Sequence, residues 1–149
     1  MALDELRGTE LGTQTITIEA GPVRAFAQSL GDDPARYRDA DGGSLGTPVT
    51  WPFVMPYWSD LGEGGAAGFP MDRLRGPGRM ILHGEQEFEF GRSPRVGETL
   101  VGEGRISDVS EKATSSATME FYVREITWRD AAGEVVVVDR FTMIVRVPT

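Results

Sequence analysis

The second half of the chain consists of strand patterns separated by turns, and this restricts the fold more than any other feature. Residues 79–90, 99–108, 116–129 and 135–147 are rich in alternating apolar and polar side chains. Such alternation is typical of strands with one buried face. The segment 130–134, Asp-Ala-Ala-Gly-Glu, has the composition of a hairpin turn. We therefore expect at least four long strands in antiparallel hairpin order.

The first half of the chain predicts a strand over 13–18 and a helix over 22–30. The helix starts with a proline, which is favourable because the N–H that proline lacks has no partner at that position. Apolar residues at i, i+3, i+4 and i+7 predict one buried face, made of Val23, Phe26, Ala27 and Leu30. Gly31 suits the left-handed conformation that ends a helix.

The most apolar segment of the first half is 47–61, T-P-V-T-W-P-F-V-M-P-Y-W-S-D-L. Proline recurs in it at every fourth position and costs about 3 kcal/mol inside a helix. A long regular helix is therefore disfavoured, whereas a kinked helix beginning near Trp51 is compatible with the pattern. The sheet needs an apolar element to cover, and this segment is the natural candidate, which predicts an α+β domain. The segment is either a buried core element or the apolar wall of a ligand site, and the two readings do not exclude each other.

Composition limits the possible functions. The 149 residues fit one domain over 1–149, with residues 1–12 as a loose leader. The chain has no cysteine, which excludes zinc-thiolate sites, and its single histidine, His83, is the one residue through which a histidine metal centre is possible, so we expect no metal. The net charge of -8 argues against nucleic acid as a partner. The sequence shows neither a signal peptide pattern nor an apolar segment long enough to span a bilayer, so we expect a cytoplasmic protein.

The nine residues 31–39, G-D-D-P-A-R-Y-R-D, combine a helix stop, turn-forming residues and carboxylates. The carboxylates of Asp32 and Asp33 emerge where the predicted helix ends. A carboxylate in such a place is either a general base or a solvated turn residue, and Asp and Pro form turns by their chemistry alone.

The segment 62–78 is rich in glycine, and three arginines lie in it or directly after it: Arg73, Arg75 and Arg79. Loops of this length are usually functional or disordered. Because arginine binds phosphate through several donors, the segment either meets the phosphates of a nucleotide-like ligand or is a solvated loop.

Three segments resemble the MaoC-like dehydratase family, in particular the N-terminal domain type of fatty-acid-synthase-like dehydratases and two-domain enoyl-CoA hydratases. Segment 31–39 is similar to the family's G-D-x-N-P-x-H-x-D, and T-P-V-T-W-P-F at 47–53 looks like its A-P-P-T-F or A-P-P-T-W. L-H-G-E-Q-E-F-E-F at 82–90, followed by P-R-V-G-E-T-L at 94–100, is the likeness most specific to this type. The resemblance implies the hotdog fold, a curled antiparallel sheet wrapped around a central hydrophobic helix.

The resemblance also implies an activity, namely reversible addition of water at the 2,3 position of an enoyl thioester, as in enoyl-CoA hydratases and 3-hydroxyacyl dehydratases. The thioester is carried on coenzyme A or acyl carrier protein, and no cofactor takes part. In active members the Asp and His of the motif share a water, so that one takes a proton while the other delivers one. Hotdog domains pair through their sheet edges, which implies a homodimer or a heteromer with a second MaoC-like subunit.

The motif carries over with one important difference. Asp32 stands at the position of the motif Asp, but Tyr37 stands at the position of the His. A tyrosine has an ordinary pKa near 10, against about 6.5 for histidine, so at neutral pH it donates a proton rather than accepting one. His83 is the one histidine that can stand in, although a histidine on a sheet strand is more often structural. On the same strand, Glu85 and Glu87 are expected to share a face, which Glu89 extends.

The site expected from the sequence therefore has a catalytic part and a substrate-binding part. The catalytic candidates are Asp32, Tyr37 and His83. The substrate-binding candidates are Pro48, Trp51, Phe53, Arg73, Arg75 and Arg79. Three functions remain open: a hydratase or dehydratase in its own right, a partly degenerate acyl-binding subunit that completes a heteromer with an intact MaoC-like protein, and a hotdog thioesterase that uses a carboxylate base.

Overall fold

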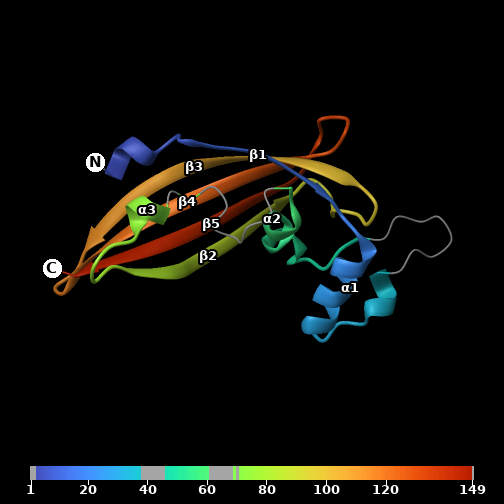
Figure 1. Cartoon of the computed structure of the whole chain (residues 1–149), viewed down its shortest axis with the longest axis horizontal. Coiled ribbons are helices and arrows are strands. Elements are labelled where there is room, and N and C mark those ends of the chain that lie inside the picture. The colour runs from blue at the N-terminus through green and yellow to red at the C-terminus, as the bar shows by residue number, and fades with distance from the viewer. Residues whose placement is uncertain (1–2, 38–45, 61–68, 70, 149) are drawn as a thin grey trace.

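Five antiparallel strands form one curled sheet in the order β1-β3-β4-β5-β2 (Figure 1). The computed structural model describes residues 3–37, 46–60, 69 and 71–148, without the side chains at positions 3 and 73. The strands are β1 (Glu10–Thr17), β2 (Met80–Phe90), β3 (Thr99–Ala113), β4 (Ala117–Arg129) and β5 (Val135–Pro148). The helical elements are η1 (Leu3–Leu6), α1 (Ala20–Ser29), η2 (Pro34–Tyr37), η3 (Trp51–Phe53), α2 (Met55–Trp58) and α3 (Met71–Leu74). The four long strands predicted for the second half are all present.

Two hairpins, β3–β4 and β4–β5, make the centre of the sheet. The predicted turn at 130–134 closes the second hairpin. In this turn Gly133 has a φ of +82°, and the carboxylate of Asp130 accepts the backbone N–H groups of Ala132 and Glu134. Strand β1 pairs with β3 and strand β2 pairs with β5, so β1 and β2 form the two edges of the sheet.

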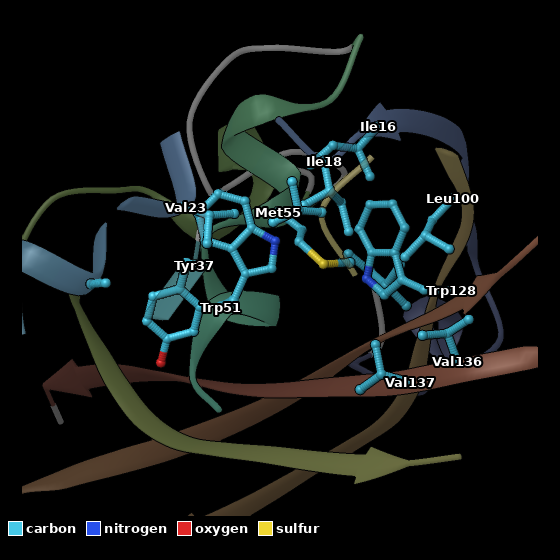
Figure 2. Close-up of a cluster of buried hydrophobic side chains, with 13 residues drawn as sticks. Ile16, Ile18, Val23, Tyr37, Trp51, Met55, Leu100, Trp128, Val136 and Val137 are labelled. Carbon is cyan, nitrogen blue, oxygen red and sulfur yellow. The ribbon is translucent and has the colours of Figure 1, made fainter. Parts of the chain in front are cut away.

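The apolar segment after residue 47 covers one face of the sheet, as predicted. Trp51 of η3 and Met55 of α2 are fully buried, in one cluster with Trp128 of β4 and Val137 of β5 (Figure 2). The sheet curls around this helical segment, and the expected α+β hotdog fold is confirmed.

Proline breaks the central helical segment into two short pieces. Pro52 and Pro56 lie within the first two positions of η3 and α2, respectively. Because proline is tolerated there and not in a helix interior, a 3-10 turn and a four-residue helix replace one long helix. The kinked segment beginning near Trp51 is therefore confirmed.

Gly102 has no side chain, and this leaves room for the indole of Trp128 in the core. A glycine inside a strand predicts a bulge or the close approach of another group, and here the structure shows a close approach. A Cβ at position 102 would lie 2.8 Å from the indole ring of Trp128 and 2.9 Å from Cγ2 of Ile126. Any larger residue at this position would displace the indole.

Two expectations for the first half are wrong. Residues 1–12 are not a loose leader from residue 3 onward, because η1 forms, Leu6 is buried and β1 already begins at Glu10. Leu30 is 53% exposed instead of buried, because α1 ends at Ser29 and the chain turns away. The other predicted face residues of this helix are buried or half-buried.

Strand β4 buries the face opposite to the one that its apolar residues suggest. Ala117, Met119, Phe121 and Val123 share a face, as their spacing predicts. Ala117 is buried, but the other three are only half-buried. The alternate positions carry the most deeply buried side chains: Tyr122, Arg124, Ile126 and Trp128. A charged residue, Arg124, therefore lies in the core on the same face as Ile126 and Trp128.

The substitution Gly102→Ala is expected to lower the free energy of unfolding by about 1–3 kcal/mol, the usual effect of overpacking a core. Urea unfolding followed by tryptophan fluorescence measures the change. Gly21→Ala is the matched control, because a Cβ at Gly21 of α1 meets nothing within 4 Å. That variant is expected to be neutral or more stable by up to about 1 kcal/mol. Equal losses in both variants would contradict the steric role of Gly102.

Candidate functional site

The acidic turn begins with a Schellman motif at the end of α1. Gly31 has a φ of +74°, and its N–H donates to the carbonyl of Gln28 at 3.1 Å. The N–H of Asp32 donates to the carbonyl of Ala27 at 3.0 Å. These two bonds satisfy carbonyl groups that the helix end leaves open. The left-handed helix stop predicted at Gly31 is confirmed, and it holds Asp32 directly after this glycine.

A second turn brings Tyr37 back to Asp32. The carboxylate of Asp33 accepts the N–H of Ala35 at 2.8 Å, which starts η2. The hydroxyl of Tyr37 then donates to Oδ2 of Asp32 at 2.6 Å, and Arg36 donates to Oδ1 at 3.0 Å. The N–H of Asp33 also donates to Oδ1, at 2.8 Å. Two of the three catalytic candidates, Asp32 and Tyr37, are therefore in direct contact.

Hydrogen bonding shifts the pKa values of both groups in a way that limits proton exchange. The Tyr37 hydroxyl, supported by the Asp33 N–H and by Arg36, holds the pKa of Asp32 below its ordinary value. The hydrogen bond to Asp32, together with partial burial, raises the pKa of Tyr37. The tyrosine therefore keeps its proton at neutral pH, and Asp32 is a weaker base than a free carboxylate.

The core holds the ring of Tyr37. Tyr37 is buried in the same cluster as Val23 and Trp51, and Figure 2 shows its hydroxyl pointing out of that cluster. Trp51 in turn packs edge-to-face on Phe26 of α1, with ring centroids 5.7 Å apart. Trp51 and Pro48, two of the predicted substrate-binding residues, are both buried. The pair of Asp32 and Tyr37 lies at the rim of the aromatic core.

His83 lies in a different environment on strand β2. Its ring contacts Phe53 with a centroid distance of 5.8 Å and Phe141 of β5 with a distance of 4.5 Å. Within the described ranges, no hydrogen bond or ring contact links His83 to Asp32 or Tyr37. The structure therefore brings His83 to the predicted substrate-binding residue Phe53 and not to the other catalytic candidates.

The three arginines near the glycine-rich segment differ in their surroundings. Arg79 donates from Nε to the carbonyl of Leu74 at 2.8 Å and forms an ion pair with Glu120. Its guanidinium is thus engaged within the chain. Arg75 follows α3 and is exposed, whereas Arg73 belongs to α3 and its side chain lies outside the described residues. Of the two arginines whose side chains are described, Arg75 is exposed to solvent and Arg79 is half-buried.

A buried ion pair on the covered face of the sheet was missed by sequence reasoning. Arg124 of β4 and Asp139 of β5 are 2% and 0% exposed, and their side chains approach to 3.4 Å. Gln86 of β2 also donates its amide to Asp139, and the guanidinium of Arg124 lies 5.5 Å from the ring centroid of Phe141. Burial raises the pKa of Asp139 to about 6, although Arg124 opposes this. Strand alternation was the available signal, since it puts Arg124 on the same face as Trp128.

Comparison with known proteins connects this geometry to a family. The family model described as FAS1-like, dehydratase domain region, matches residues 5–139, which is most of the chain. The chain belongs to this dehydratase family. With the structural likenesses below, the resemblance to MaoC-like hotdog dehydratases is confirmed. No curated protein matches the sequence.

Three solved structures illustrate the likeness. The C-terminally truncated HadBC (3R-hydroxyacyl-ACP dehydratase) complex from Mycobacterium tuberculosis has a TM-score of 0.67 at 18% identity, with 96% of this chain and 99% of that chain covered. The MaoC-like dehydratase from Phytophthora capsici has a TM-score of 0.68 at 21% identity, with 98% of this chain and 49% of that chain covered. The ChsH1–ChsH2 complex from Mycobacterium tuberculosis has a TM-score of 0.63 at 17% identity, with 93% of this chain and 84% of that chain covered. At these identities the likenesses establish the fold alone.

Two classes of feature are absent from the described part of the chain. It contains no group of three or more His, Asp or Glu side chains arranged to hold a metal ion. None of its helices is long and apolar enough to cross a membrane. The candidate site is the carboxylate turn at the end of α1 with the aromatic residues beside it.

The substitution Tyr37→Phe is expected to raise the pKa of Asp32, because it removes the hydrogen bond that contributes most to lowering that pKa. In the native chain the stability contributed by Asp32 is present above its unfolded pKa and is lost as the pH falls through its lower folded pKa. NMR titration of the carboxyl carbon measures the shift. Tyr122→Phe, which removes a hydroxyl bonded to Glu120, is the control and should leave Asp32 unchanged. An equal pKa of Asp32 in both variants and in the native chain would show that the hydrogen bond from Tyr37 does not lower this pKa.

The substitution Asp139→Asn is expected to lower the free energy of unfolding by about 3–5 kcal/mol, because it removes the carboxylate that compensates the buried charge of Arg124. The double variant Asp139→Leu/Arg124→Met removes both charges at similar volume and is expected to be about as stable as the native chain, or more so. Denaturant unfolding of both variants separates the two outcomes. A double variant as unstable as the single one would show that charge compensation is not the cause.

Proposed function

We propose that this chain is the acyl-thioester-binding subunit of a hydratase or dehydratase, and that a second MaoC-like chain supplies the complete Asp/His pair. The assembly adds or removes water at the 2,3 position of an acyl group carried on coenzyme A or acyl carrier protein. Membership of the dehydratase family supports this class of reaction. The observation that carries the subunit role is the 2.6 Å hydrogen bond from Tyr37 to Asp32, where the motif has a histidine.

The chemistry of hydration explains why this hydrogen bond matters. One group must take a proton from water while another delivers a proton to the α-carbon, and both must face the same water. Asp32 accepts hydrogen bonds from three donors, which weakens it as a base, and Tyr37 keeps its proton. The single histidine of the chain contacts Phe53 and Phe141 instead. The site therefore supports binding better than proton transfer.

An open cavity next to the central helical segment supports a binding role. Its volume is about 550 Å³, within the range of about 300–1,000 Å³ typical of small-molecule sites. It is lined by Thr15, Thr17, Glu19, Pro22, Trp51, Trp58, Ser59 and Asp60. Trp58 is 57% exposed and offers an apolar surface to a thioester-linked chain, with hydroxyl groups around it for the polar part.

Structures similar to this chain include complexes of two named components, HadBC and ChsH1–ChsH2. A chain without the motif histidine suits one half of such an assembly, because the other half can contribute the complete motif. A homodimer is the alternative arrangement, and it leaves both halves with the Tyr37 substitution.

The purified chain alone is expected to leave the absorbance of crotonyl-CoA unchanged. Together with a MaoC-like protein that has the intact G-D-x-N-P-x-H-x-D motif, it is expected to give turnover above that of the partner alone. Asp32→Asn in this chain should then lower the rate of the mixture far less than the loss of a working general base does, which is about 10²–10⁴-fold.

Two outcomes would overturn the proposed role. Turnover by the chain alone that Asp32→Asn abolishes would make it a hydratase in its own right. Release of free thiol from acyl-CoA, measured with a thiol reagent, would instead make it a thioesterase.

A further inference from the structure

The two edges of the sheet differ in how they are occupied. On strand β1, the N–H of Thr15 donates to Oδ1 of Asp60 at 2.7 Å, and the N–H of Asp60 donates to the carbonyl of Thr15 at 2.8 Å. The chain itself thus blocks the middle of this edge. Strand β2 pairs with β5 on one side, and no described strand pairs with its other side. An edge of 11 residues is a template for pairing with another chain.

The side chains of β2 show what kind of strand this edge can accept. Met80, Leu82 and Phe90 are 53%, 39% and 39% exposed, which is unfavourable for an edge that stays in water. Between them, Glu85, Glu87 and Glu89 are exposed at every second position. We call these three residues the glutamate row. The edge therefore combines apolar side chains with a block of negative charge.

Among the described residues, Arg140 is the cation bonded to the glutamate row, and it is shared with another carboxylate. Arg140 of β5 donates to Glu87 at 2.5 Å and to Glu89 at 3.0 Å, and it also donates to Glu125 of β4 at 2.7 Å. Glu87 and Glu89 nevertheless keep 60% and 67% of their side-chain surface exposed. Glu125 is also bonded by Arg105, but in the described structure the three glutamates of the row have only Arg140. The row therefore keeps excess negative charge and is open to a further cation.

Pairing of two identical copies would bring this charge together. In a two-fold antiparallel pair, residue i of one copy lies opposite residue j of the other, and j opposite i. A pair centred within 85–89 therefore puts glutamate opposite glutamate, with Cβ atoms about 4.5–5.5 Å apart, and like charges in that position are destabilising. A strand with basic side chains at the same positions would pair favourably.

We propose that the β2 edge disfavours a second copy of this chain and fits the edge strand of a different MaoC-like subunit, one that places Arg or Lys opposite the glutamate row. The identification of the partner as MaoC-like rests on the proposed function. The charge selection rests on the edge itself, so its failure and that of the proposed function are distinguishable.

A charge-reversed copy of the chain serves as a surrogate partner. The variant Glu85→Lys/Glu87→Lys/Glu89→Lys and the native chain are each expected to be monomeric in sedimentation at low ionic strength. Their equimolar mixture is expected to dimerise, with a dissociation constant at least about tenfold below that of either chain alone. At about 1 M salt, where the Debye length is about 3 Å, this advantage should shrink.

Two further variants keep the test decisive. Glu10→Lys/Glu103→Lys/Glu111→Lys makes the same change in net charge at exposed positions of β1 and β3, which do not pair with β2, and its mixture with the native chain should stay monomeric. Glu85→Gln/Glu87→Gln/Glu89→Gln removes the repulsion without reversing the charge, so it should self-associate more strongly than the native chain even if the lysine variant fails to fold.

The proposal is overturned if the native chain forms a stable homodimer at low ionic strength. It is equally overturned if the mixture with folded lysine variant stays monomeric, if the control mixture dimerises as strongly, or if the glutamine variant associates no more than the native chain. None of these measurements involves an acyl thioester. A hydratase active without a partner would refute the proposed function and leave the sedimentation result standing.

Discussion

Burial of Trp51 and Met55 against Trp128 fixes the helical segment on the sheet, and the rest of the structure depends on this contact. A fully buried indole contributes roughly 4–6 kcal/mol from the area it removes from water. The contact requires two local features: prolines that shorten the helical pieces of this segment, and a glycine at 102 that gives the indole of Trp128 room. A curled sheet around a short apolar segment follows from these features.

The same core determines what the candidate site can do. The ring of Tyr37 is buried in the cluster of Trp51, so its hydroxyl has a defined direction and meets Asp32 at the end of α1. A tyrosine held in this way orients and stabilises an ionised carboxylate. It does not exchange protons with that carboxylate at neutral pH. The packing of one ring therefore limits proton transfer at the position where the family motif places a base.

Charge is distributed differently over the two faces and two edges of the sheet. The covered face contains Arg124 and Asp139, which are buried next to aromatic rings and compensate each other at a considerable desolvation cost. The opposite face carries Arg140 and its exposed glutamate partners next to the β2 edge. Asp60 blocks part of the β1 edge. These differences leave β2 as the edge suited to a partner and make the charge of that partner important.

The sequence by itself determined the strands, the turn at 130–134, the helix stop at Gly31 and the replacement of the motif histidine by Tyr37. These features depend on local alternation, on backbone preferences and on residue identity. Only the tertiary structure decided that Tyr37 returns to Asp32 while His83 lies against Phe53 and Phe141, and that β4 buries Arg124. The physical reason is that the ring contacts of His83, the ion pair of Arg124 and the core contacts that hold the ring of Tyr37 join residues distant in the chain. Alternation identifies the two faces of a strand, but neighbouring strands and the covering segment decide which face is buried.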